Sequence, residues 1–162
     1  GRMATEHLID RGSLRIGHIA GPLEMDSARK RQLGFTDAMT AAGLDPTLQA
    51  EGQYTSSSGR VVLDLLRRSP ELDGLFVAND LMAATAVAAI QETGRRVPED
   101  IRVIGFDDSV AALQPTPQLT TMTNAAAEST RIAAEMLIEI LRGGNPDSPV
   151  VLHSSVVLRG ST

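Results

Sequence analysis

Polar side chains that can bind hydroxyl groups follow each of four apolar segments along the chain. They comprise two hydroxyl-bearing residues, an arginine, an amide and three carboxylates: Ser27, Tyr54, Arg31, Asn79, Asp80, Asp107 and Asp108. A carboxylate accepts hydrogen bonds from hydroxyl groups, an amide both accepts and donates, and a guanidinium donates in a fixed fork. An aromatic ring can cover the apolar face of a sugar. The set matches a small, neutral ligand that is rich in hydroxyl groups.

Each of these residues also has a purely structural interpretation. The alternatives are helix capping for Ser27 and Asn79, a cap or helix-dipole partner for Asp80, a surface ion pair for Arg31, a core edge for Tyr54, and the start of a solvated loop for Asp107 and Asp108. Whether these seven residues bind a ligand or have these structural roles depends on whether the fold brings them to one place.

Catalytic chemistry has little support in the sequence. The three histidines, His7, His18 and His153, lack the spacing of metal ligands, and His18 lies within an apolar strand, as core histidines do. No nucleophile elbow, phosphate-binding loop or dinucleotide-binding glycine motif is present. The adjacent Asp107 and Asp108 point in different directions in an extended loop, so they cannot act as an acid/base pair. We therefore expect a protein that is not an enzyme and that needs no metal or cofactor.

Apolar periodicity and turn residues predict alternating helices and strands. The expected helices cover residues 3–11, 27–42, 58–66, 80–93 and 125–142, and the expected strands cover residues 14–20, 48–53, 74–78, 101–106, 119–122 and 150–158. This alternation implies right-handed crossovers and a doubly wound parallel α/β sheet with helices on both faces. Ligands bind such sheets beyond the carboxyl ends of the strands, which is where the polar residues fall. That convergence favours binding over the structural alternatives.

Composition narrows the class of protein further. The 162 residues include no Cys, which excludes disulfides and thiolate chemistry. No segment approaches the roughly 20 apolar residues that cross a membrane, and residues 1–10 do not resemble a signal peptide. The formal net charge is −5, which argues against nucleic-acid binding by this chain alone.

Six blocks of sequence resemble one protein family. They are residues 19–22 (IAGP), 27–35 (SARKRQLGF), 74–83 (GLFVANDLMA), 97–108 (VPEDIRVIGFDD), 119–121 (LTT) and 158–162 (LRGST). In this order they resemble the effector domain of LacI-type bacterial transcription regulators. The resemblance covers nearly the whole chain and implies a periplasmic-binding-protein-like fold of two lobes that hold a small effector between them.

The resemblance also implies a division of the chain between the lobes. Residues 1–12 and 123–149 are expected in the N-terminal lobe, residues 13–122 in the C-terminal effector-binding lobe, and residues 150–162 as a strand that returns to it. The DNA-binding helix-turn-helix is then expected outside this chain. Helices 3–11 and 125–142 would lack their sheet, and we expect them to pack against each other or against a second copy.

The family's binding residues carry over to six positions. The expected contacts are Arg31 and Ser27 to effector hydroxyls, Tyr54 as the stacking ring, Asn79 and Asp107 as the amide and carboxylate, and Asn124 as a polar contact at the lobe crossover. Ala126 stands where several family members have a bulky aromatic residue, which implies a roomier pocket. The pair Asn79 and Asp107 favours a sugar over a purine.

The mechanism that the resemblance implies is a shift between two arrangements of the lobes. The regulator is expected to be a cytoplasmic homodimer. It is expected to contact operator DNA through an N-terminal part outside this chain and to contact no membrane. The candidate dimer surface comprises Ala83, Ala84, Ala86 and Val87 with the helix at 58–66. The alternative for these alanines is close packing against the sheet. Two other functions have the same fold class: a sugar-binding receptor of a transport system, and an α/β enzyme of sugar metabolism.

Overall fold

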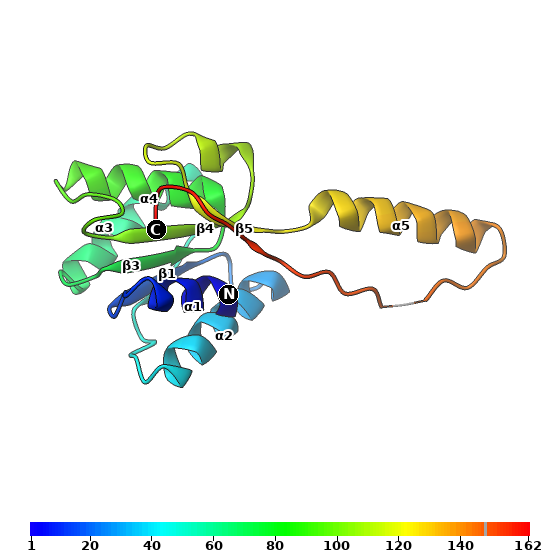
Figure 1. Ribbon diagram of the computed structural model, residues 1–162, viewed down its shortest axis with the longest axis horizontal. Helices are drawn as coiled ribbons and strands as arrows, with labels where there is room; N and C mark the ends of the chain where they lie inside the picture. Colours follow the sequence, from blue (N-terminus) through cyan, green and yellow to red (C-terminus); the bar gives the residue numbers. More distant parts are fainter. Residues whose placement is uncertain (148) are drawn as a thin grey trace.

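A computed structural model describes residues 1–147 and 149–162 and contains one six-stranded sheet (Figure 1). The strands are β1 (Ile16–Ala20), β2 (Gln49–Glu51), β3 (Gly74–Val77), β4 (Arg102–Asp107), β5 (Thr120–Thr123) and β6 (Val156–Val157). Their order in the sheet is β2-β1-β3-β4-β5-β6. Strands β1 to β5 are parallel, and β6 pairs antiparallel with β5.

Helices cover both faces of this sheet, as the doubly wound prediction requires. Helices α1 (Arg2–Asp10) and α2 (Asp26–Ala41) lie on one face, and α3 (Gly59–Arg68) and α4 (Asp80–Glu92) lie on the other (Figure 1). The cluster under α1 and α2 holds all three phenylalanines: Phe35, Phe76 and Phe106. The cluster under α3 and α4 consists of aliphatic residues and Met82, with Tyr54 packed at its edge. Two separate cores therefore hold the sheet in place.

Helix α1 lies on this sheet, contrary to the expectation that residues 1–12 belong to another lobe. Its Ala4 and Leu8 are fully buried in the same cluster as Phe35 and Met39 of α2. Burying a leucine contributes about 1.5–3 kcal/mol, so the helix is anchored here. The expectation that α1 would lack a sheet and would pack against helix 125–142 or against a second copy is therefore wrong.

Helix α4 packs tightly on the sheet because it presents small side chains to it. Ala83, Ala86 and Val87 are almost completely buried in the core, so these three residues cannot form a dimer surface. The alternative of helix-to-sheet packing is correct for them, and of the four α4 residues in the proposed surface only Ala84 keeps partial exposure.

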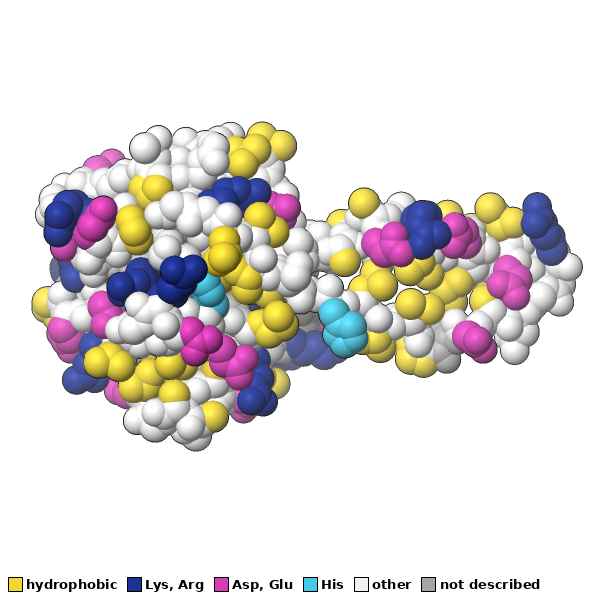
Figure 2. Space-filling model, in the orientation of Figure 1, with side chains coloured by type: hydrophobic (Ala, Val, Ile, Leu, Met, Phe, Trp, Pro, Cys, Tyr) yellow, Lys and Arg dark blue, Asp and Glu magenta, His cyan; other side chains and the backbone are white. Residues whose placement is uncertain are grey.

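The remaining helix, α5 (Ala126–Leu141), extends away from the sheet (Figure 1). We call residues 124–147 and 149–155 the arm: it consists of α5 and the described residues between α5 and β6. No residue of α5 is buried, and Leu141 is 77% exposed. Figure 2 shows apolar side chains along the arm. As expected, this helix lacks a sheet to cover it.

The chain returns to the sheet over a shorter strand than predicted. Only Val156 and Val157 pair with β5, whereas a strand over 150–158 was expected. Residues 150–152 instead lie near α5, where Val150 and Leu152 line a small groove with Ile132 and Met136. After β6, the buried Ser161 donates to the Val103 carbonyl and accepts from the Thr120 amide, which fixes the end of the chain against β4 and β5.

Candidate functional site

The carboxyl ends of the parallel strands β1 to β5 meet at one edge of the sheet, here called the carboxyl edge. All six predicted binding residues lie at this edge. Ser27 and Arg31 are in the first turns of α2, Tyr54 follows β2, Asn79 follows β3, Asp107 ends β4, and Asn124 follows β5. The topology thus brings together residues that are far apart in the sequence.

Arg31 is held between two aromatic rings. Its Nη1 donates to the Tyr54 hydroxyl at 3.1 Å, and its Cζ lies 3.8 Å from the centroid of the Phe106 ring. Gly21 permits this arrangement, because a Cβ there would lie only 2.0 Å from the Tyr54 Cζ. The guanidinium is therefore positioned before any ligand binds.

Phe106 is a site residue that the sequence reasoning missed. It occupies the position before Asp107 in β4 and is buried in the cluster under α1 and α2. Its place beside a predicted ligand residue in a chain with few aromatics was the available signal. The contact with Arg31 depends on the packing of α2 against β4, which no local pattern in the sequence predicts.

Asp107 and Asn124 form a second pair at the carboxyl edge. Asn124 Nδ2 donates to Asp107 Oδ1 at 3.1 Å, while Asn124 Oδ1 accepts from the Ala126 amide at 2.9 Å. Burial raises the pKa of Asp107 above its usual value, and the Asn124 hydrogen bond and the charge of Arg31 oppose that rise. Asn124 thus links the carboxylate to the first turn of α5.

Helix capping, the structural interpretation of both Asn79 and Ser27, is correct for Asn79 and wrong for Ser27. Asn79 Oδ1 accepts from the Met82 amide at 3.0 Å, so Asn79 is the N-cap of α4, as its alternative interpretation proposed. That bond uses the amide oxygen and not the amide nitrogen. Met25, and not Ser27, occupies the N-cap of α2, so the capping interpretation of Ser27 is wrong. Ser27 is exposed in the first turn of the helix.

Asp80 is not the cap of α4, but it is the acidic residue in the first turn of that helix, as the helix-dipole alternative proposed. It is fully buried and accepts hydrogen bonds from Thr121 Oγ1 in β5 and from the Ser109 amide in the loop after β4. Burial raises the pKa of this carboxyl group. Gly105 leaves room for it, since a Cβ there would lie 2.4 Å from Asp80 Oδ1. Asp80 therefore joins α4, β5 and the loop that carries Asp107.

Unusual backbone conformations gather at the same edge. In the described ranges 1–147 and 149–162, the non-glycine residues with positive φ are Tyr54 (57°), Asp107 (115°), Asp108 (53°) and Ala125 (50°). Such conformations cost about 1–3 kcal/mol each and persist only where the surroundings enforce them. All four adjoin a predicted binding residue or are one, which is typical of a site whose geometry is set in advance.

His18 has the structural role that its position in an apolar strand predicts. Its ring is fully buried and stacks on Phe76 and Phe35, with ring centroids at 4.5 Å and 5.2 Å. Its Nδ1 lies 3.0 Å from the Phe76 carbonyl oxygen, and burial lowers its pKa to about 3. A histidine held neutral in a closed core does not serve as a base for a ligand at the edge.

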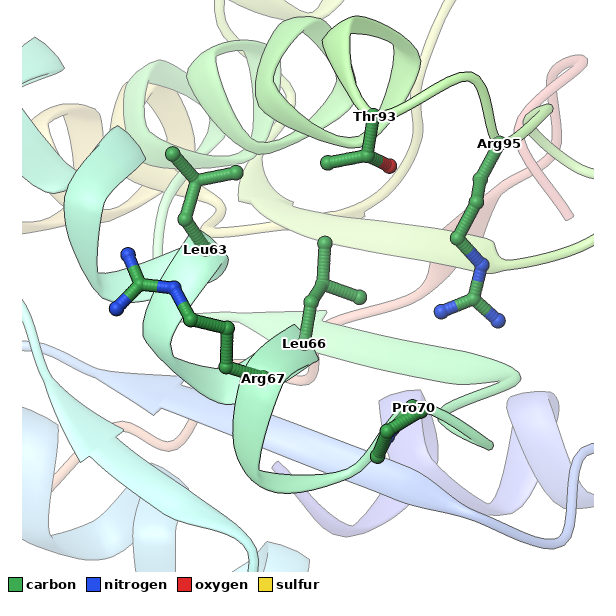
Figure 3. A pocket seen from close by; sticks show the side chains of 6 residues that line it. All are labelled: Leu63, Leu66, Arg67, Pro70, Thr93 and Arg95. Atoms are coloured by element: carbon green, nitrogen blue, oxygen red, sulfur yellow. The ribbon is translucent and has the colours of Figure 1, made fainter.

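The described residues hold neither a metal centre nor a membrane-spanning helix, and they form a groove away from the carboxyl edge. No group of three or more His, Cys, Asp or Glu side chains there has a metal-binding arrangement, and none of the helices described is both long and apolar enough to span a membrane. A groove of about 420 Å³ lies between the end of α3 and the turn after α4 (Figure 3). Its lining residues precede β3 and β4, so it lies at the opposite edge from the predicted site.

Comparison with known proteins gives one consistent result. Residues 5–162 match the model of the periplasmic binding protein-like domain. The chain is 38% identical to the HTH-type transcriptional regulator CelR of Thermobifida fusca, over 99% of this chain and 48% of CelR. It is 34% identical to the HTH-type transcriptional repressor PurR of Aliivibrio salmonicida, over 99% of this chain and 50% of PurR. The chain thus spans about half the length of the curated relatives it matches.

Solved structures agree with these relatives. A transcriptional regulator CelR–cellobiose complex superimposes with a TM-score of 0.92 at 36% identity, over 99% of this chain and 50% of that one. The lac repressor dimer bound to operator and an anti-inducer superimposes with a TM-score of 0.91 at 32% identity, over 99% of this chain and 49% of that one. These relatives are transcription regulators and not enzymes.

Proposed function

The chain belongs to the family of LacI-type transcription regulators, as an effector-binding domain of the periplasmic-binding-protein-like kind, and we propose that it senses a sugar for such a regulator. The observation that carries this proposal is the pairing at the carboxyl edge. The Arg31–Tyr54 and Asp107–Asn124 pairs present fixed donors and acceptors at this edge, where the Phe106 ring lies against the Arg31 guanidinium. This combination suits a neutral ligand with many hydroxyl groups.

We propose that the carboxyl edge forms one side of a cleft and that a second lobe forms the other. The arm supports this, because it leaves the sheet at Asn124 with its apolar side chains uncovered. In the longer protein, residues 123–149 would belong to the second lobe, with residues 13–122, helix α1 and the end of the chain forming the first. The chain's match to half of each relative leaves room for that lobe and for a DNA-binding part.

The mechanism follows from the proposed two-lobed arrangement, in which the chain leaves the first lobe after β5 and returns to it at β6. An effector that contacts both lobes stabilises the arrangement in which both sets of contacts form, and so shifts the population of lobe arrangements. The shift changes the relative positions of the two DNA-binding parts in a dimer, and hence operator affinity. A regulator that acts in this way works in the cytoplasm, in contact with DNA.

We propose that dimerisation uses the solvent side of α4. A groove of about 440 Å³ there is lined by residues of α4 together with Ser56 and Pro115, and the exposed Leu81 lies beside Ala84 in it. Ala84→Arg should convert the dimer of the full-length regulator to monomers, as measured by sedimentation velocity. Leu14→Arg alters an exposed apolar residue away from this groove and should leave a dimer. A dimer in the Ala84→Arg variant would exclude this surface.

A thermal-shift screen tests the proposed ligand class. The full-length regulator is heated with cellobiose, other disaccharides, monosaccharides and purine bases, and we expect stabilisation by at least one sugar and by no purine. Stabilisation by a purine base alone would contradict the sugar assignment. Sugar binding by a protein that shows no affinity for DNA would favour a transport receptor instead.

A further inference from the structure

The loop after β4 holds Asp107 in a conformation that needs external support. Asp107 and Asp108 are consecutive and both have positive φ, at 115° and 53°. Side chains other than glycine rarely adopt such conformations, and two in succession are more demanding still. The loop therefore depends on its neighbours to keep the Asp107 carboxylate at the carboxyl edge.

Three contacts supply that support from three different parts of the chain. Asp80 of α4 accepts from the Ser109 amide at 2.7 Å, and Asn124 donates to Asp107 at 3.1 Å. The third contact comes from Arg159, whose Nη2 donates to Asp108 Oδ1 at 2.6 Å. Asn124 thus contacts Asp107, Arg159 contacts Asp108 and Asp80 contacts Ser109, so three successive residues are each held from outside the loop.

Arg159 is anchored more firmly than a surface arginine. Its Nη1 donates to the Leu119 carbonyl at 2.9 Å, and its amide donates to Thr120 Oγ1 at 3.0 Å. Its side chain is 18% exposed, whereas the Arg and Lys side chains in the other ion pairs of the described residues are 48–75% exposed. Ion pairs shielded from solvent are screened less and are geometrically more definite.

We propose that Arg159 is a positioning residue for effector binding: by holding Asp108, it fixes Asp107 in the orientation that binds the ligand. Arg159 follows β6, on the segment that returns from the arm. The orientation of Asp107 therefore depends on the path of the chain between the lobes. This inference rests on the proposed function for its ligand, but the support of the loop can be tested without any ligand.

The guanidinium suits this role because it serves two acceptors at once. Its planar fork reaches the Leu119 carbonyl with one nitrogen and Asp108 with another. A lysine ammonium is a point charge on a flexible stem and lacks that fixed geometry. Arg159→Lys should therefore restore only part of what Arg159→Met loses.

The first experiment uses no ligand and measures backbone hydrogen exchange at residues 107–110 of the 162-residue chain. We expect Arg159→Met and Asp108→Asn each to accelerate exchange there at least tenfold, with little further change in the double variant and an intermediate effect in Arg159→Lys. The pKa of Asp107, measured by carbon NMR, should fall towards the usual value for aspartate as the loop becomes solvated. Arg96→Met, which removes the Arg96–Asp100 pair at the opposite edge, is the matched control.

The second experiment measures sugar affinity in the full-length regulator. Arg159→Met should weaken binding about tenfold or more, and Arg96→Met should not. Unchanged exchange at residues 107–110 would overturn the positioning role whatever the regulator binds. Faster exchange with unchanged sugar affinity would overturn the link to the ligand, and faster exchange in a regulator that binds no sugar would overturn the proposed function instead.

Discussion

The sheet and the helices packed on it, here called the body, bury most of their apolar side chains, whereas helix α5 of the arm buries none. On the body, α4 buries Met82, Ala83, Ala86, Val87, Ala89 and Ile90, whereas α5, which is longer, buries no residue. Both helices are rich in alanine and aliphatic side chains, so composition alone does not separate them. The difference lies in what covers them: the sheet covers the apolar face of α4, whereas the described residues leave α5 without a buried side chain.

The carboxyl edge lies where these two regions meet. Asp107 belongs to the last strand position of β4, and Asn124 begins the arm; one hydrogen bond joins them. Under the proposed function, a ligand that binds at this junction would contact both the sheet and a segment that leads to a second lobe. That is the arrangement by which binding can alter the geometry of a two-lobed regulator.

The largest difference in the free energy of unfolding is expected between two alanine variants, one in the buried core of the body and one in the exposed arm. Phe35→Ala, in the buried cluster under α2, should lower the free energy of unfolding of the 162-residue chain by about 3–5 kcal/mol. Leu141→Ala, in the exposed part of α5, should change it by less than about 0.5 kcal/mol. Urea titration followed by circular dichroism measures both values. Similar losses for the two variants would show that α5 is covered in solution.

A smaller effect is expected for ligand binding at the junction. Asp107→Ala should weaken the affinity of the full-length regulator for its sugar about 100-fold, because it removes an acceptor from ligand hydroxyls and is worth about 2–3 kcal/mol. The unfolding free energy should change little, since Asp107 is only half-buried. Calorimetric titration and urea unfolding report the two quantities. Asp100→Ala, at the opposite edge, is the control, and an unchanged affinity in Asp107→Ala would remove that residue from the site.

The stability of the body should depend on pH through His18. Its folded-state pKa is lowered to about 3 from an unfolded value of 6.5, so the folded protein keeps it neutral while the unfolded chain takes up a proton. Stability is therefore full above pH 6.5 and is lost as the pH falls from there towards 3, by about 2 kcal/mol between pH 6.5 and 5. His18→Leu should flatten this part of the profile. An equal slope in both proteins would assign the loss to other groups.

The smallest effect is expected at the start of the arm. Ala125 has φ of 50°, which glycine adopts without the penalty that a Cβ imposes. Ala125→Gly should relieve about 1 kcal/mol there and leave the free energy of unfolding of the body unchanged. Hydrogen exchange in the first turn of α5 would measure the gain in the full-length regulator, with Ala127→Gly, inside the helix, expected to act in the opposite direction. A loss in both variants would show that the strain at Ala125 is absent in solution.

Much of the body follows from the sequence because its signals are local. Apolar runs bounded by glycine and proline mark β1 and β3, and the same rule that places ligands at strand ends brings Arg31, Tyr54 and Asp107 to one edge. The specific roles of Asn124 and Ser27 came from the resemblance to a family. The ligand contacts of all six predicted residues stay predictions.

The features that the sequence did not predict depend on contacts between distant segments. Phe106 meets Arg31 through the packing of α2 on β4, and Arg159 meets Asp108 across 51 positions of chain. The placement of α1 failed for the same reason, since an amphipathic helix does not specify which sheet covers it. The short β6 is a further case: valine-rich sequence at 150–158 predicts a strand, but only Val156 and Val157 form strand pairs with β5.

The most direct test compares sugar binding by two lengths of the protein. Cellobiose and the other sugars that stabilise the full-length regulator are titrated calorimetrically into that regulator and into the 162-residue chain under the same conditions. If the carboxyl edge is one side of a two-lobed cleft, the regulator should bind and the chain alone should bind at least 100-fold more weakly. Equal affinity would contradict this account, because the whole site would then lie within the body described here.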